Sequence, residues 1–243
     1  MARTGPTGIL PRMGMNEPPL PTRAGAWPAR YCPDLAREPA SAQPAPGDPD
    51  WRLLRQHWLP NGPEPRFQPG WARVQWNERA LRYEAVLKGR GPKNAACGLN
   101  ERTWELGDIC EIFFQDCGGE RYLEIHVTPE NQRLQLRWTP ETFRAFVDGG
   151  MRDLSAPLVG DPAWLSSTAR VHEDYWSVCA IIPAQSLPIR DGALRVGAVF
   201  LTAVCRYDCS TGPGFVLSST APLSEPSYHR RHEWDPLQLM GPV

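Results

Sequence analysis

The clearest pattern of hydrophobic and polar positions lies between Trp104 and Asn131. Residues 108–115 are rich in apolar and aromatic side chains, residues 116–120 form a glycine-bearing turn, and residues 122–128 return with strict alternation. Alternation over that length is typical of a strand with one buried face. The sequence therefore predicts a β-hairpin. Its second face, which we expect to point outward to a polar ligand, carries Tyr122, Glu124 and His126.

Shorter patterns of the same kind extend to both sides of this hairpin. They predict strands at 72–76, 81–87, 134–138, 169–171 and 175–182, a long central strand at 194–207, and a short helix around 141–146. Short strands separated by turn signals about every ten residues, with hardly any helical period, indicate an all-β sandwich. Residues 50–243 are predicted to form this single domain.

Residues 1–49 have a different composition, because proline, alanine and glycine interrupt the chain every few positions. Such a segment buries too little apolar surface to offset its ordering entropy, so it is predicted to be a disordered or loosely packed tail. A passive leader is favoured over a partner-binding motif, although Trp27 and Tyr31 offer docking points. No signal-peptide core is visible, so the chain as written is expected to stay inside the cell unless its true start differs from Met1.

Charge and cysteine usage narrow the classes of partner. The formal net charge is −1, which offers no electrostatic footprint for nucleic acid or an anionic membrane. No apolar run reaches the roughly 18 residues of a membrane helix. The seven cysteines have no metal-ligand spacing, and Cys110, Cys179 and Cys205 lie in apolar strands. Reduced thiols are therefore predicted, with Cys205 and Cys209 as the candidates for an exception.

Motifs of enzymes are scarce in this sequence. It contains no GxSxG, no HExxH and no phosphate-binding glycine loop. Glu111 and Glu124 have three interpretations: a glycosidase acid/base pair, a structural brace for the hairpin together with Asp108 and Arg206, or acceptors for sugar hydroxyls. The second and third are favoured equally over the first.

Metal binding has only weak signals. Asp108, Asp116 and Glu120 suggest a structural calcium site, but their spacing matches no defined calcium loop. His229 and His232 are separated by two arginines, and a solvated loop is favoured over a ligand pair there. The prediction is therefore no metal and no catalytic residue, with calcium left open.

Three blocks of the sequence resemble the family-9 carbohydrate-binding modules and their relatives. The blocks are RVQWNERALRYEAVL, then TWELGDICEIFFQD with YLEIHVTPEN, and finally WSVCAIIPAQSL, RVGAVFLTAVCRYD and PSYHRRHEWDPLQL. They follow the family's order across roughly residues 50–240. The resemblance implies an immunoglobulin-like, jelly-roll-type antiparallel β-sandwich that binds a mono- or oligosaccharide, in some members with structural calcium.

The resemblance also implies positions for a sugar site. Two aromatic rings clamp a terminal sugar in the family; Trp104 matches one of them, and Tyr228 falls near the other, where tryptophan is usual. The predicted ligand-binding residues are Trp104, Glu111, Glu124, His126, Arg206 and Tyr228. Other tryptophans, namely Trp76, Trp138 and Trp176, are expected to be core residues. The implied function is non-catalytic carbohydrate binding that supports polysaccharide breakdown beside a separate glycan-degrading enzyme.

Two other hypotheses stay open at this point. Related sandwiches hold a haem between their sheets, and His126 with Met151 would supply axial ligands. Alternatively, the chain is an interaction domain that kept the fold and lost its ligand. An enzyme is the least favoured class.

Overall fold

The computed structural model describes residues 25–36, 44, 47–190 and 192–242, which fold mainly into β-strands. The strands are β1 (Trp27–Tyr31), β2 (Arg52–Leu54), β3 (Gly70–Asn77), β4 (Ala80–Lys88), β5 (Ile109–Asp116), β6 (Tyr122–Val127), β7 (Arg133–Trp138), β8 (Ser166–Val171), β9 (Tyr175–Pro183), β10 (Val199–Asp208), β11 (Val216–Ser219) and β12 (Asp235–Leu239). The helical elements are α1 (Pro140–Asp148) and the short 3-10 helices η1 (Thr103–Glu105), η2 (Ala184–Ser186) and η3 (Arg231–Glu233).

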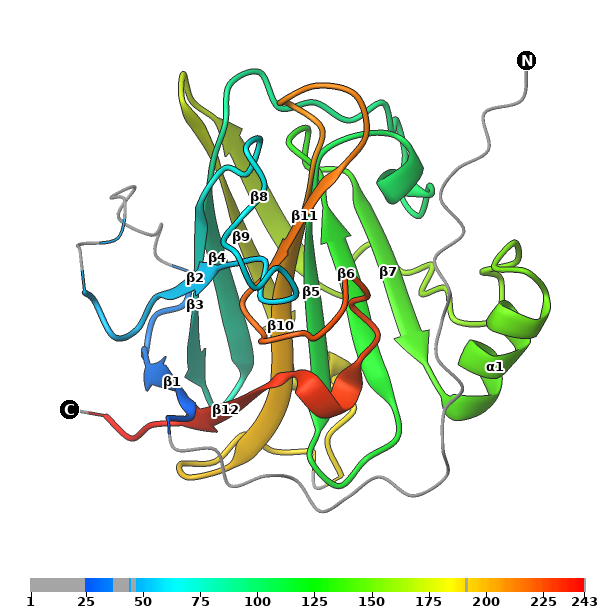
Figure 1. The fold of residues 1–243 in the computed structure, drawn as a ribbon. Helices are drawn as coiled ribbons and strands as arrows, with labels where there is room; N and C mark the ends of the chain where they lie inside the picture. The colour runs from blue at the N-terminus through cyan, green and yellow to red at the C-terminus, as the bar shows by residue number, and fades with distance from the viewer. Residues whose placement is uncertain (1–24, 37–43, 45–46, 191, 243) are drawn as a thin grey trace.

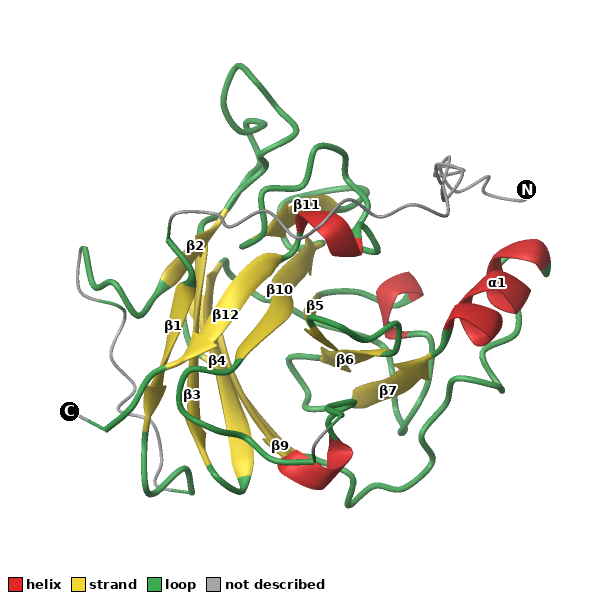
Figure 2. Ribbon diagram, turned by 90° about the horizontal axis from the view of Figure 1, so that it is seen from below, coloured by secondary structure: helices red, strands yellow, loops and turns green. Residues whose placement is uncertain are grey.

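The strands form one strongly curled sheet whose two halves face each other (Figures 1 and 2). Its order is β7-β6-β5-β10-β12-β1-β3-β4-β9-β8, with β11 beside β10 and β2 beside β3. Alternate residues of both halves meet in the main core, among them Ile112 and Ile125 from one side and Val74, Leu81 and Val178 from the other. Apolar side chains that recur every second residue require two such facing layers. The predicted all-β sandwich is confirmed.

The predicted local elements are also present, with shifted ends. The hairpin of β5 and β6 pairs Glu111 with His126 and Phe113 with Glu124. The predicted helix is α1, which Thr139 caps by accepting a hydrogen bond from the Thr142 amide at 3.2 Å. The central strand β10 begins later than expected. A turn containing Gly197, at φ +82°, precedes it.

The prediction that residues 1–49 lie outside the domain is wrong for Trp27–Tyr31. This segment is β1, which pairs in parallel with both β12 and β3 and closes the curled sheet between them. Trp27 is fully buried in the core, where its indole N–H donates to the Asp50 carbonyl at 3.0 Å. The sheet is consequently mixed rather than purely antiparallel. Residues 1–24, 37–43 and 45–46 lie outside the described residues.

The face of β5 and β6 that was predicted to point outward is covered, and this is a second correction. A second apolar cluster packs on it, with Phe113 and Leu136 from the sheet and Leu223, Tyr228 and Trp234 from the C-terminal segment. Figure 1 shows this segment crossing in front of the sheet before it enters β12. Polar residues on that face therefore lie inside the protein, where an unpaired polar group is costly.

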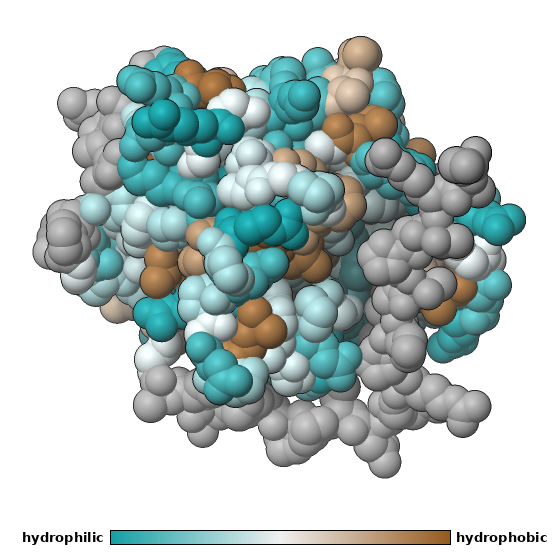
Figure 3. Space-filling view, turned by 45° about the horizontal axis from the view of Figure 1, so that its top comes forward, coloured by the Kyte–Doolittle hydropathy of each residue, from teal (hydrophilic) through white to brown (hydrophobic). Residues whose placement is uncertain are grey.

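On the face drawn in Figure 3, hydrophobic side chains form small groups among hydrophilic ones. Among the described residues, no helix is both long and apolar enough to cross a bilayer. The seven cysteines are free thiols.

Candidate functional site

A cavity of about 500 Å³ lies over the covered face of β5, β6 and β7. The sheet forms its floor, η1 and the loop after α1 form two walls, and the segment before η3 forms a third. Five of the six residues predicted as a sugar site line this one cavity: Trp104, Glu111, Glu124, His126 and Tyr228. The fold thus brings together residues that are more than 120 positions apart in the sequence.

Strand register explains how the polar side chains of the floor converge. Glu111 on β5 is directly opposite His126 on β6, and Phe113 is opposite Glu124. Residues that are opposite each other, or two apart along one strand, share a face of the sheet. Glu111, Glu124 and His126 therefore point the same way, and all three are buried.

Glu124 is the centre of a hydrogen-bond network in the floor. Its Oε2 accepts from the Trp138 indole N–H at 2.7 Å, and its Oε1 accepts from Nε2 of His126 at 2.8 Å. On the far side of the imidazole, Nδ1 of His126 lies 2.8 Å from the Thr103 hydroxyl. Since both ring nitrogens have partners, the imidazole is fixed in orientation. Charge-assisted bonds of this kind are stronger than neutral ones, so Glu124 is held as a rigid carboxylate.

Glu111 differs from Glu124 because its carboxyl group makes no hydrogen bond to any described residue. Its nearest ionic partner is Nε2 of His126, at 3.4 Å from Oε1. The residue is only 3% exposed, yet it lines the cavity. Buried polar groups are almost always paired in folded proteins, so this carboxyl is a group that a bound molecule would complete.

The protonation states of these groups follow from their surroundings. Burial raises the pKa of Glu111 to about 8, against the opposing charge of His126. Burial acts in the same direction on Glu124, but His229, His126 and Trp138 outweigh it and keep the pKa of Glu124 below its ordinary value. Burial opposes the charge on His126, whereas the two glutamates raise its pKa overall. At neutral pH Glu111 is thus a protonated donor beside an ionised Glu124, and the surrounding acids favour the charged form of His126.

Trp104 supplies the accessible aromatic surface of the cavity. The ring is half-buried, and its edge packs on His126 with ring centroids 5.8 Å apart. The Arg102 guanidinium stacks over the indole at 4.7 Å and donates at 3.0 Å to the carbonyls of Met151 and Arg152. Arg102 therefore joins the Trp104 ring to the loop after α1, which limits the ring's rotation.

Tyr228 also lines the cavity, but as a buried wall rather than an open ring. It is 4% exposed, and its hydroxyl donates to the Arg206 carbonyl at 2.6 Å and accepts from the Ser218 amide at 3.1 Å. Its ring packs edge-on against Phe113 and Tyr207. The hydroxyl is therefore committed to the fold, and only part of the ring is available to the cavity.

Arg206 does not belong to the site, and its prediction is wrong. On β10, Cys205 and Tyr207 face the second apolar cluster, so the intervening Arg206 points to the opposite face. There its Nη2 lies 3.1 Å from Asp208 Oδ2, and both side chains are almost fully buried. This ion pair braces the interior of the sandwich.

Sequence reasoning missed His229, which had been assigned to a solvated loop. Its Nδ1 lies 2.9 Å from the Tyr122 hydroxyl, and its Nε2 lies 3.7 Å from Glu124 Oε2. Burial lowers the pKa of His229. Trp138 was correctly predicted as a core residue, and it also donates to Glu124. The loop before η3 has no periodic pattern, so only its contact with the sheet shows the position of His229.

The residues proposed for metal or haem do not fit those groups. Asp108 precedes β5 and Asp116 ends it, so the two stand roughly 25 Å apart at about 3.3 Å per residue, and Glu120 adjoins only Asp116. Among the described residues, no three His, Cys, Asp or Glu side chains are grouped to hold a metal ion. Met151 lines the cavity with His126, but both nitrogens of His126 are engaged, which leaves none for an axial bond to iron.

Comparison with known proteins identifies structures with a similar fold. No known protein-family profile matches the sequence, and no curated protein matches it either. Solved structures do match. A proposed carbohydrate-binding protein from Bacteroides uniformis is similar with a TM-score of 0.62 and 14% identity, over 78% of this chain and 85% of the other.

Two structures of a family 9 carbohydrate-binding module from Caldicellulosiruptor kristjanssonii are also similar. The complex with cellotriose has a TM-score of 0.56 and 13% identity over 89% of this chain and 94% of the module. The complex with glucose has a TM-score of 0.50 and 14% identity over 72% and 78%. The chain has the fold of the family 9 carbohydrate-binding modules. At this level of identity, the likeness concerns the fold alone.

Proposed function

We propose that this protein is a non-catalytic carbohydrate-binding module and that the cavity beside Trp104 holds one sugar unit. The observation that carries the proposal is the Glu111 carboxyl, which is buried, lines the cavity and makes no hydrogen bond to any residue that the structure describes. A pyranose has an apolar face and a fringe of hydroxyls. The half-buried Trp104 ring offers a stacking surface for the first, and Glu111 offers a donor or acceptor for the second.

The carboxylates support binding better than hydrolysis. Glycosidases need one free carboxylate as nucleophile or base and one acid. Glu124 already accepts hydrogen bonds on both oxygens, from Trp138 and His126, so it has little freedom to attack or to activate water. The two carboxyl groups are therefore better suited to binding hydroxyl groups of a sugar than to catalysing its hydrolysis.

The expected affinity follows from the same contacts. Stacking that buries on the order of 100 Å² on Trp104 contributes about 2–3 kcal/mol at roughly 25 cal/mol per Å². A hydrogen bond from the neutral Glu111 carboxyl adds about 0.5–1.5 kcal/mol, and association costs offset part of the sum. Since these contacts total less than about 5 kcal/mol, a weak complex with a dissociation constant of roughly 1 mM or above is expected.

Isothermal titration with glucose and cellotriose tests the proposal, because these sugars are the ligands in the similar family 9 complexes. Replacement of the stacking ring in Trp104→Ala should weaken binding about 30- to 150-fold, the equivalent of the stacking energy. The matched control is Tyr175→Ala, which removes another half-buried aromatic ring that does not line this cavity. Equal affinity in Trp104→Ala and the unmodified protein would place the sugar elsewhere.

Absence of heat with every sugar tested would instead favour an interaction domain without a carbohydrate ligand. A role in polysaccharide breakdown beside a separate glycan-degrading enzyme stays a prediction. Its test is whether the protein increases an added glycanase's release of sugar from insoluble cellulose, and whether Trp104→Ala removes that increase.

A further inference from the structure

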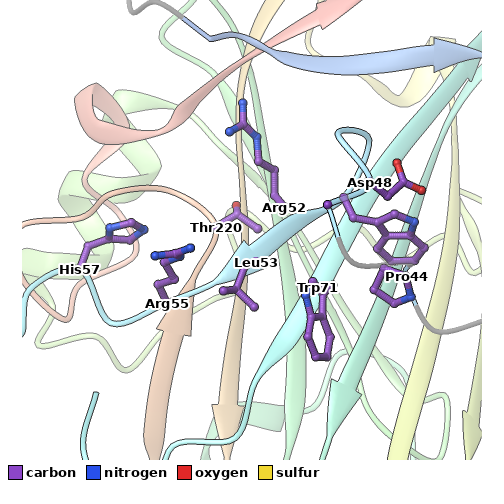
Figure 4. A pocket seen from close by; sticks show the side chains of 10 residues that line it. Pro44, Asp48, Arg52, Leu53, Arg55, His57, Trp71 and Thr220 are labelled. Atoms are coloured by element: carbon purple, nitrogen blue, oxygen red, sulfur yellow. The ribbon is translucent and has the colours of Figure 1, made fainter. Parts of the chain in front are cut away.

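A second hollow, of about 600 Å³, lies at the edge strand β2 and shares no lining residue with the cavity beside Trp104. The strand β2, the neighbouring residue Trp71 on β3, and Thr220 after β11 contribute to its lining (Figure 4). β2 pairs with β3, and Arg55 just beyond it forms a bridge to Ser219. The hollow therefore lies on rigid, paired backbone.

Strand geometry places an aromatic ring and a cation on one face of this edge. Leu53 is directly opposite Trp71, and Arg55 follows Leu53 by two residues. Arg55 and Trp71 are thus a diagonal cross-strand pair, with a separation of about 7–8 Å. That distance is comparable to one pyranose ring with its exocyclic substituent. Trp71 is half-buried and Arg55 is exposed, so both are accessible from the hollow.

Two basic side chains in this hollow have unused hydrogen-bond donors. The Arg55 guanidinium and the His57 imidazole make no hydrogen bond or ion pair with any described residue. Arg52, on the other face of the strand, donates to the Gly25 carbonyl at 2.7 Å. The acid among the lining residues is Asp48, whose carboxylate accepts from the Asp50 amide at 3.0 Å.

Arg55 is the charged group that faces His57 in this hollow. Burial lowers the pKa of His57, and the charge of Arg55 lowers it further, so the imidazole is held in its neutral form. The chain as a whole has a formal net charge of −1, so this local excess of positive charge is not a general property of its surface. A bound anion would offset the charge of Arg55, favour the protonated form of His57 and accept hydrogen bonds from both side chains.

The tryptophan rings beside these basic side chains indicate which kind of anion would bind in the hollow. Trp51 continues the alternation of β2 on the same face, and the Arg73 guanidinium covers one side of its ring at 4.7 Å. No cation of the described residues lies over Trp71, so its ring is the better platform for a flat or ring-shaped ligand. A simple inorganic anion would leave that platform unused.

We propose that this hollow is a second binding site, for an anionic sugar unit that stacks on Trp71 and directs its carboxylate or sulfate group to Arg55 and His57. Arg55 forms the stronger contact, because a guanidinium can donate two parallel hydrogen bonds to either group. The site is independent of the Trp104 cavity, since no lining residue is common to both.

Calorimetric titration with D-glucuronate, D-glucose 6-sulfate, neutral D-glucose and inorganic sulfate tests this proposal and separates carboxylate from sulfate ligands. Either charged sugar should bind, and Arg55→Gln should weaken that binding at least tenfold. Arg195→Gln is the matched control, because Arg195 is also exposed and also has no side-chain partner among the described residues. Arg195→Gln should bind the charged sugars with the affinity of the unmodified protein, and Trp104→Ala should do the same.

Two further measurements separate this site from general charge attraction. Trp71→Leu should weaken the binding of the charged sugars but not the binding of inorganic sulfate. NMR titration of the His57 ring should show that the pKa of His57 rises when a charged sugar is bound. Equal losses in Arg55→Gln and Arg195→Gln would overturn the proposal. So would sulfate binding as tightly as glucose 6-sulfate, or no binding of either charged sugar. Loss of glucose binding in Trp104→Ala alone would leave it unaffected.

Discussion

The buried Glu111 makes stability depend on pH in a way that a single substitution should remove. The pKa of Glu111 is raised from 4.5 to about 8 in the folded protein, chiefly by burial. The folded state therefore keeps a proton that the unfolded state releases from about pH 4.5 upward. Raising the pH between these two values favours the unfolded state, and the stabilisation is complete only below the lower value.

The size of this effect can be worked out from the shift. The rise in the pKa of Glu111 from 4.5 to about 8 corresponds to roughly 5 kcal/mol, at about 1.36 kcal/mol for each tenfold change in proton affinity. A typical domain has about 5–15 kcal/mol of net stability, so the loss between pH 4 and pH 9 is large enough to measure. His126 acts in the same direction, because its pKa is also raised and its charged form is lost as the pH rises.

Glu111→Gln keeps the shape of the side chain but cannot ionise. Urea denaturation across pH 4–9 should show a flatter dependence for this variant, which gains stability over the unmodified protein as the pH rises. Glu120→Gln, at an exposed glutamate, is the matched control and should follow the original curve. Parallel curves for Glu111→Gln and the unmodified protein would refute the reasoning about Glu111.

Two further predictions concern parts of the fold that the sequence pattern did not reveal. Tyr228→Phe should lower the free energy of unfolding by about 1–3 kcal/mol, because the Ser218 amide and the Arg206 carbonyl lose their buried partner; a loss below about 0.5 kcal/mol in urea denaturation would contradict this. Trp27→Ala should cost about 3–5 kcal/mol through the cavity that it leaves between β1 and the core. Unchanged stability would mean that β1 is not part of the folded domain.

The hairpin, the neighbouring strands and the short helix were predictable because their signals are local. A period of two in residues 122–127 and the Thr139-Pro140 helix start depend only on side chains a few positions apart. Strand alternation also fixes relative facing, so Glu124 and His126 were expected on one face and lie there. The resemblance of the short blocks pointed to the sandwich as a whole.

Alternation cannot tell what covers each face of a strand. The face of Glu111 and Glu124 was predicted to be open, whereas Trp234 and Tyr228, more than 100 residues later, pack over it. On β10 both faces are apolar, so the pattern gave no basis for the side taken by Arg206.

The sequence by itself determined most of the strands between residues 70 and 208 and which of their residues face the same way, since these properties follow from backbone geometry and nearby side chains. Only the tertiary structure decided that β1 belongs to the sheet, that the acids are buried and that His229 joins them. The physical reason is that burial, and with it the pKa of Glu111, depends on segments far apart in the chain that meet only in the folded protein.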